Sequence, residues 1–146
     1  MIDTLVQVPA GWLVAESPPE GIALAAIDPA GDGPLRTNLV VTMVDRPAVN
    51  DVERYLDSVL ANLLTELDDA RLVDAWTTDN RRGQPPTLGQ RILVHHRVGA
   101  ELVAVVQQHT WIDDTIVVVT VTSPIDLADD LVVVLSSCLE SIAIAA

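Results

Sequence analysis

Short segments rich in Val, Leu, Ile and Thr recur along this chain, a composition typical of β-strands. Gly, Pro, Asp or Asn residues bound most of these segments. The strands are expected at 5–8, 12–16, 22–27, 36–45, 71–77, 88–98, 101–112 and 115–122. This pattern predicts a protein dominated by β-sheet.

A spacing of three and four residues between apolar positions distinguishes the segment 51–67 from the predicted strands, and it predicts an amphipathic helix. The apolar positions of this segment are Val52, Tyr55, Leu56, Val59, Leu60, Leu63, Leu64 and Leu67. Asn50 is the expected N-cap, and Glu53 three residues later completes a capping-box pattern.

The same helical spacing returns near the C-terminal end of the sequence, between Leu127 and Ile142. This second helix is expected to begin with Ser123 as its N-cap and Pro124 at its first position. The sequence therefore predicts an α+β fold, with a central antiparallel sheet of six to seven strands flanked by two main helices. No linker or repeat divides residues 1–146, so we expect a single domain.

Two short turns, at residues 99–100 and 113–114, join the last three strands into an antiparallel meander. With two-residue loops, Val98 faces Glu101 and Ile112 faces Thr115. This register predicts a polar cluster on one face of the sheet, made of Gln90, Gln107, His109 and Thr120. It also predicts a polar stripe on the other face, made of Arg91, His95 and Arg97.

Each polar group allows two interpretations. Because buried polar groups require partners, the cluster is either a satisfied internal network or a pocket for a small ligand. The stripe is either an ordinary solvated edge or a contact for an acidic or carboxylate-bearing partner. Trp111 shares the face of the cluster. The candidate ligand or partner contacts are therefore Arg91, His95, Arg97, Gln107, His109 and Trp111.

The charge of the chain narrows the range of partners. The formal net charge is −13, which disfavours binding to nucleic acids and to anionic membranes. Such acidity mostly serves solubility, and a basic partner is the alternative. The N-terminal segment has neither a signal-peptide pattern nor a lipid-anchor cysteine, so we expect a cytoplasmic protein without a membrane anchor.

No local motif indicates catalysis or metal binding. His95 and His96 are adjacent in a predicted strand, so they point to opposite faces and cannot easily share an ion. Cys138 lies on the apolar face of the second predicted helix, where a buried thiol is expected. There is no glycine-rich phosphate loop and no nucleophile elbow. We therefore expect no enzyme activity, no cofactor and no metal.

The order of elements and several local phrases resemble the PsbP-like superfamily. The phrases are VPAGW, GIALAAID, RTNLVVTMV before a helix, a strand with Gly89 and Arg91, and VVQQHTW. The superfamily includes Mog-type, DcrB-like and LpqN-type proteins, and the Eag-type secretion chaperones are similar. The resemblance implies a sheet flanked by helices and a role in binding proteins or assisting assembly and secretion. It assigns no binding residue.

Together, these features predict a non-enzymatic protein-binding module of the assembly- or secretion-chaperone type. A homodimer is expected, because the chain is rich in aliphatic residues and its last predicted helix has a broad apolar face. The alternative is a small-ligand-binding domain that uses the polar cluster or the stripe.

Overall fold

The computed structural model describes residues 8–29, 36–45, 52–80, 87–112 and 115–125, and within them it contains seven strands and one α-helix. The helix is α1 (Val52–Glu66). The strands are β1 (Leu13–Val14), β2 (Ile22–Ile27), β3 (Asn38–Asp45), β4 (Arg71–Asn80), β5 (Thr87–Val98), β6 (Glu101–Ile112) and β7 (Thr115–Pro124).

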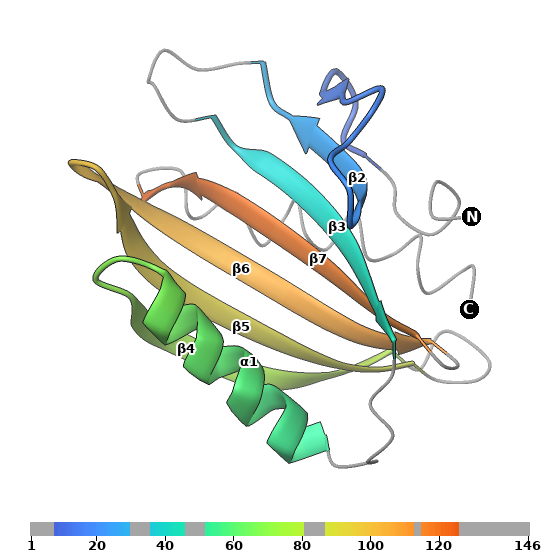
Figure 1. Cartoon of the computed structure of the whole chain (residues 1–146), viewed down its shortest axis with the longest axis vertical. Helices are drawn as coiled ribbons and strands as arrows, with labels where there is room; N and C mark the ends of the chain where they lie inside the picture. Colours follow the sequence, from blue (N-terminus) through green and yellow to red (C-terminus); the bar gives the residue numbers. More distant parts are fainter. Residues whose placement is uncertain (1–7, 30–35, 46–51, 81–86, 113–114, 126–146) are drawn as a thin grey trace.

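All seven strands belong to one antiparallel sheet in the order β1-β2-β3-β7-β6-β5-β4 (Figure 1). The predicted meander is present as β5, β6 and β7, and its register is confirmed: Val98 pairs with Glu101, and Ile112 pairs with Thr115. Gly99 in the first turn has a φ of 60°, a left-handed conformation that glycine adopts without steric cost. Consequently the predicted division of side chains between the two faces holds for these strands.

A compact apolar core occupies the face of the sheet away from α1. Its buried members are Leu24, Leu39, Val41, Ala104, Val106, Val117, Val119 and Val121. Val8, Trp12, Leu93 and Ile125 pack against it. The buried members come from four neighbouring strands, β2, β3, β7 and β6, because alternate residues of each strand project to the same side. Burial of this many aliphatic side chains supplies a large share of the driving force for folding.

Helix α1 covers only one end of the opposite face, over β4, β5 and β6 (Figure 1). The predicted helix is confirmed with slightly shorter bounds, and its expected N-cap Asn50 lies outside the described residues. After α1 the chain reverses at Asp69, whose φ is 50°, and Asp68 accepts a hydrogen bond from the Arg97 amide at 2.9 Å. No described helix covers the same face over β2, β3 and β7.

The start predicted for the second helix is wrong. Ser123 and Pro124 are the last residues of β7, paired with Ala104 and Val103 of β6. The Ser123 hydroxyl donates to the carbonyl of Pro124 at 3.0 Å and does not cap a helix. The run of β-branched residues before Ser123 favours continued pairing. The remainder of that predicted helix lies at 126–146, outside the described residues, so the two-helix arrangement is not confirmed.

The predicted strand bounds need two further corrections. The segment 12–16 forms only the two-residue β1, and most of the expected strand 5–8 lies outside the described residues. Strand β4 runs to Asn80 rather than ending at Thr77, because residues 78–80 still pair with β5. None of the described helical residues forms a helix long and apolar enough to cross a membrane.

Candidate functional site

Three members of the predicted polar cluster, Gln107, His109 and Thr120, are joined by a continuous series of hydrogen bonds beneath α1. The side chain of the fourth member, Gln90, lies outside the described part of the structure. The Tyr55 hydroxyl lies 3.0 Å from Nδ1 of His109, and Nε2 of His109 lies 2.6 Å from Oε1 of Gln107. The Gln107 amide then donates to the Thr120 hydroxyl at 3.1 Å. Tyr55 comes from the helix, while Gln107, His109 and Thr120 come from β6 and β7. The side chains of these four residues therefore act as hydrogen-bond partners for one another.

These hydrogen bonds determine which ring nitrogen of His109 carries the proton. Oε1 of Gln107 can only accept, so Nε2 carries the proton and Nδ1 accepts from the Tyr55 hydroxyl. The His109 side chain is 2% exposed, and burial lowers its pKa from 6.5 to about 4. Burial also raises the pKa of Tyr55. A neutral imidazole with both nitrogens bonded matches a satisfied internal network better than an open pocket.

The two halves of this sheet face meet at Thr120. Gln107 pairs with Thr120, Thr120 pairs with Val40, and Val40 pairs with Ala25, so these residues form one row across four strands. Residues directly opposite one another project from the same face. The series of hydrogen bonds therefore ends on β7, the first strand of the part of the face that α1 does not cover, next to β3.

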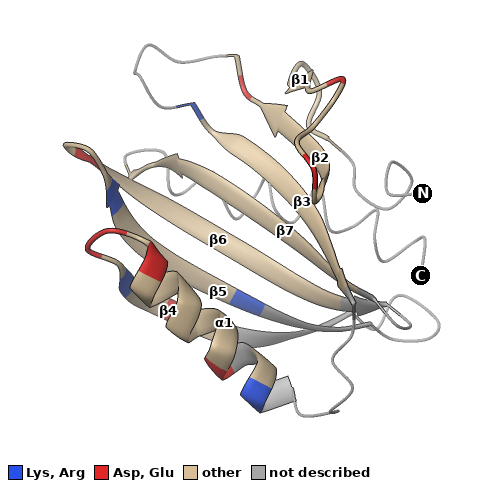
Figure 2. Cartoon of the chain, in the orientation of Figure 1, with Lys and Arg blue, Asp and Glu red and all other residues tan. Residues whose placement is uncertain are grey.

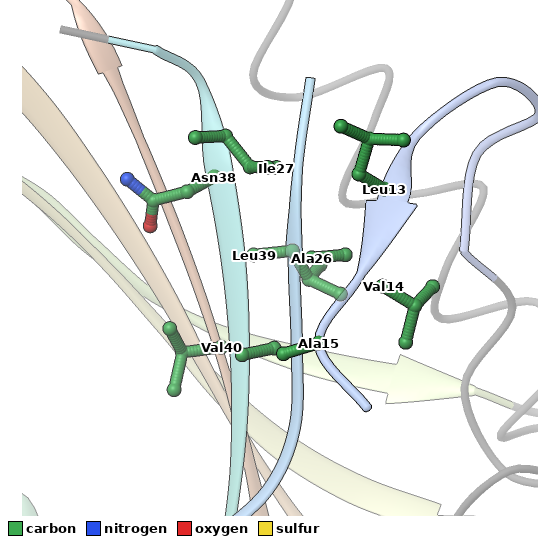
Figure 3. A pocket seen from close by; sticks show the side chains of 9 residues that line it. Leu13, Val14, Ala15, Ala26, Ile27, Asn38, Leu39 and Val40 are labelled. Carbon is green, nitrogen blue, oxygen red and sulfur yellow. The ribbon is translucent and has the colours of Figure 1, made fainter. Parts of the chain in front are cut away.

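A shallow apolar groove lies beyond this row, across β1, β2 and β3, with a volume of about 330 Å³ (Figure 3). It is lined by Leu13, Val14, Ala15, Ala25, Ala26, Ile27, Asn38, Leu39 and Val40. Asn38 supplies the one polar side chain of this lining. Leu13 is 61% exposed and Ile27 is 40% exposed. The groove thus presents aliphatic side chains to solvent with no charged group in its lining.

The predicted stripe of Arg91, His95 and Arg97 does not form one site. Arg91 is half-buried and donates from Nε to Oε1 of Gln108 at 3.0 Å, and burial lowers its pKa. Arg97 is exposed and forms an ion pair with Asp69, with 3.1 Å between nitrogen and oxygen. His95 lies between them, opposite Ala104. Four residues of strand separate Arg91 from His95, about 13 Å, so the two cannot easily hold one small group.

The other residues considered in the sequence lie apart from one another. Trp111 occupies the register position opposite Ile116. His95 and His96 project to opposite faces, and His96 is buried with no hydrogen-bond partner at Nδ1. Cys138 lies outside the described residues. Within the described ranges, no group of three or more His, Cys, Asp or Glu residues is placed to hold a metal ion.

Two features lie outside the expectations from the sequence. The apolar spacing places Tyr55 on the apolar face of a helix, although it is the single tyrosine of the chain and carries a hydroxyl that a buried position must satisfy. The groove has no local signal, because Leu13, Ile27 and Val40 come from three separate segments. Their exposure depends on which strands α1 covers, which the spacing of apolar residues does not determine.

Comparison with known proteins shows which solved structures have a similar fold. No protein-family profile and no curated protein matches the sequence. The structure is similar to LpqN of Mycobacterium tuberculosis, described as involved in cell envelope biogenesis, with a TM-score of 0.69 and 12% identity. This match covers 92% of this chain and 79% of LpqN.

A second similar structure is the cyanobacterial PsbP protein of Synechocystis sp. PCC 6803, with a TM-score of 0.63 and 14% identity over 93% of this chain and 83% of that protein. A third is a Pseudomonas aeruginosa protein of unknown function, with a TM-score of 0.61 and 12% identity over 84% of this chain and 79% of that protein. At such identities the likeness concerns the fold alone. The chain has a PsbP-like fold, as the resemblance implied.

Proposed function

We propose that this protein is a non-enzymatic binding module that holds a protein segment in the apolar groove across β1, β2 and β3. The observation that carries the proposal is the exposure of aliphatic side chains there, with Leu13 61% and Ile27 40% exposed around an uncharged lining. Adjacent exposed apolar residues on a soluble domain are typical of interaction sites. Burying them against a partner would contribute about 25 cal/mol per Å² of apolar area.

The polar cluster is less suited to ligand binding than the groove. A ligand site needs polar groups that turn toward the ligand, whereas Gln107 and His109 bond to residues of the fold itself. An incoming ligand would have to displace α1 to reach His109. The groove requires no such rearrangement, since its lining is already partly open to solvent.

The shape of the groove favours a protein segment over a small molecule. Small-ligand sites usually enclose most of the ligand surface and measure about 300 to 1,000 Å³. The groove is at the lower end of this range, and the exposed Leu13 side chain shows how open its border is. A polypeptide, which extends beyond the groove in both directions, can use such a shallow surface.

A homodimer and a cytoplasmic location remain part of the proposal. The apolar side chains that would support self-association lie at the other end of the sheet, where Leu72, Val73 and Val98 are exposed. Sedimentation velocity over a range of concentrations would detect a dimer, and Val73→Asp should shift it toward the monomer. A monomer at every concentration would exclude the dimer without affecting the groove.

Selection from a random-peptide display library tests the proposed function. We expect the selected peptides to be rich in aliphatic residues and to lose at least about tenfold in affinity, or about 1.4 kcal/mol, with Leu13→Asp or Ile27→Asp. Leu64→Asp is the matched control, because Leu64 is 40% exposed on α1 and distant from the groove lining. Peptides that bind both groove variants unchanged would contradict the proposal.

A further inference from the structure

The groove lies at an edge of the sheet. Strand β1 is the first strand in the order, and among the described residues it pairs only with β2. The Ala15 amide donates to the carbonyl of Ala25 at 2.9 Å, so the backbone of Ala15 faces β2. Because backbone direction alternates along a strand, the N–H and C=O groups of Val14 face away from the sheet. They lie directly beside the apolar lining.

The opposite edge of the sheet is protected. Strand β4 has a bulge between Leu72 and Asp74, and the Asp74 carboxylate accepts a hydrogen bond from the Ala75 amide at 2.8 Å. Bulges and carboxylates at an edge are devices that discourage the addition of another strand. The described part of β1 shows neither device. An extended peptide is therefore better accommodated beside β1 than beside β4.

The charges around the groove are mainly acidic. Glu16 directly follows the lining residue Ala15, and Glu20 lies in the same connection between β1 and β2, where both are exposed. Figure 2 shows acidic segments in this connection and no charged segment along the middle of β2, β3 and β7. The basic residue of this region, Arg36, has its guanidinium bonded to the Pro29 carbonyl at 3.1 Å. The net charge of −13 adds to this acidic field.

We propose that the occupant of the groove is an extended peptide segment with alternating aliphatic side chains, flanked by Lys or Arg residues. The peptide backbone would pair with Val14 at the border of the groove, its aliphatic side chains on that face would pack against Leu13, and the basic flanks would face Glu16 and Glu20. This inference rests on the proposed function and adds the chemistry of the partner. Strand addition gives affinity through backbone bonds, and the side-chain surface and the charges give selectivity.

Fluorescence anisotropy with two labelled peptides tests this inference. Both peptides have the same six-residue core of alternating Val and Thr, with blocked termini; one carries two Lys at each end and the other carries two Glu. In 50 mM NaCl we expect the Lys-flanked peptide to bind at least about tenfold more tightly. Higher salt should reduce that ratio, because these charges are exposed to solvent.

Two double variants separate local from overall charge. Glu16→Gln with Glu20→Gln removes two acids beside the groove, and Asp57→Asn with Glu66→Gln removes two exposed acids from α1. Both change the net charge equally. We expect only the first pair to lower the affinity ratio between the two peptides, by about threefold or more, since nearby charges interact most strongly.

The outcomes distinguish the two proposals. If both peptides bind equally well and Leu13→Asp weakens both, the charged flanks are wrong and the groove stands. If the two double variants act alike, the preference belongs to overall charge, and the inference about Glu16 and Glu20 is overturned. If neither peptide binds, or if Leu13→Asp changes neither affinity, both the inference and the proposed groove are contradicted.

Discussion

One face of the sheet has two halves that use similar strand residues in different ways. Over β4, β5 and β6, helix α1 covers the sheet, and the polar groups of Tyr55, His109 and Gln107 satisfy one another. Over β1, β2 and β3, no described helix covers the sheet, and Leu13 and Ile27 remain exposed. Polar residues that satisfy one another therefore mark the covered half, whereas exposed apolar residues mark the half that we propose as the binding surface.

This contrast reverses a common expectation about functional sites. Histidine and glutamine on a sheet suggest a binding site, but here the hydrogen bonds and the 2% exposure of His109 assign them to the interior. Exposed aliphatic residues are frequent on protein surfaces and are informative only where they gather. The groove is such a cluster of exposed aliphatic residues, because one uncharged surface spans three neighbouring strands.

The largest effect is expected from removing the imidazole at the centre of the covered half. His109→Ala leaves a cavity and deprives both Tyr55 and Gln107 of a partner, so it should lower the free energy of unfolding by about 4 kcal/mol. Urea denaturation measures this. Leu13→Ala in the open half is the comparison, with an expected loss of at most about 0.5 kcal/mol. Equal losses of unfolding free energy in the two variants would show that the covered and open halves do not differ in their contribution to stability.

The next effect is a pH dependence confined to the covered half. The pKa of His109 is lowered from 6.5 to about 4, so the unfolded state binds its proton first as pH falls. The stabilisation is complete above about pH 6.5 and is lost between about pH 6.5 and 4, by about 3 kcal/mol in total. Denaturation at several pH values should show this slope in the native protein.

The control for the pH experiment is His109→Gln, which has no titrating group at this position. The two proteins share every carboxylate, so the difference between their stability curves isolates the imidazole. That difference should change by about 3 kcal/mol between pH 7 and pH 4. Parallel curves for the two proteins would show that His109 does not carry a lowered pKa.

The smallest effect is expected at the contact between helix and sheet. Tyr55→Phe retains the ring contact with His109, whose centroids are 5.5 Å apart at an interplanar angle of 75°, and removes only the hydroxyl. The loss of the donor to Nδ1 should cost about 1 to 2 kcal/mol. Urea denaturation near pH 7 measures it. An unchanged stability would show that the hydroxyl does not hold α1 to the sheet.

The meander shows how far the sequence specifies this fold. Two short turns were enough to predict the pairs of Gln107 with Thr120 and of His109 with Val118. Local turns and alternation determine such contacts, because the register has only one solution once the loops are short. The helix α1 was equally well predicted, since its apolar spacing continues for four turns.

Ser123 and the groove show where the sequence is insufficient. Ser123 followed by Pro124 has the pattern of a helix start, yet pairing with Ala104 and Val103 of β6 prevails over that local preference. The groove depends on the pairing of β1 with β2 and of β2 with β3, together with the limited extent of α1. These are tertiary features, so no local pattern could identify Leu13 as a candidate contact.

The central claim is that the open half binds and the covered half does not, and amide chemical-shift mapping tests it most directly. A ¹⁵N-labelled sample would be titrated with the Lys-flanked aliphatic peptide. We predict the largest shifts at Leu13, Val14 and Ile27, with Gln107 and His109 nearly unchanged. The largest shifts at Gln107, His109 and Tyr55, with none across β1 to β3, would contradict the account.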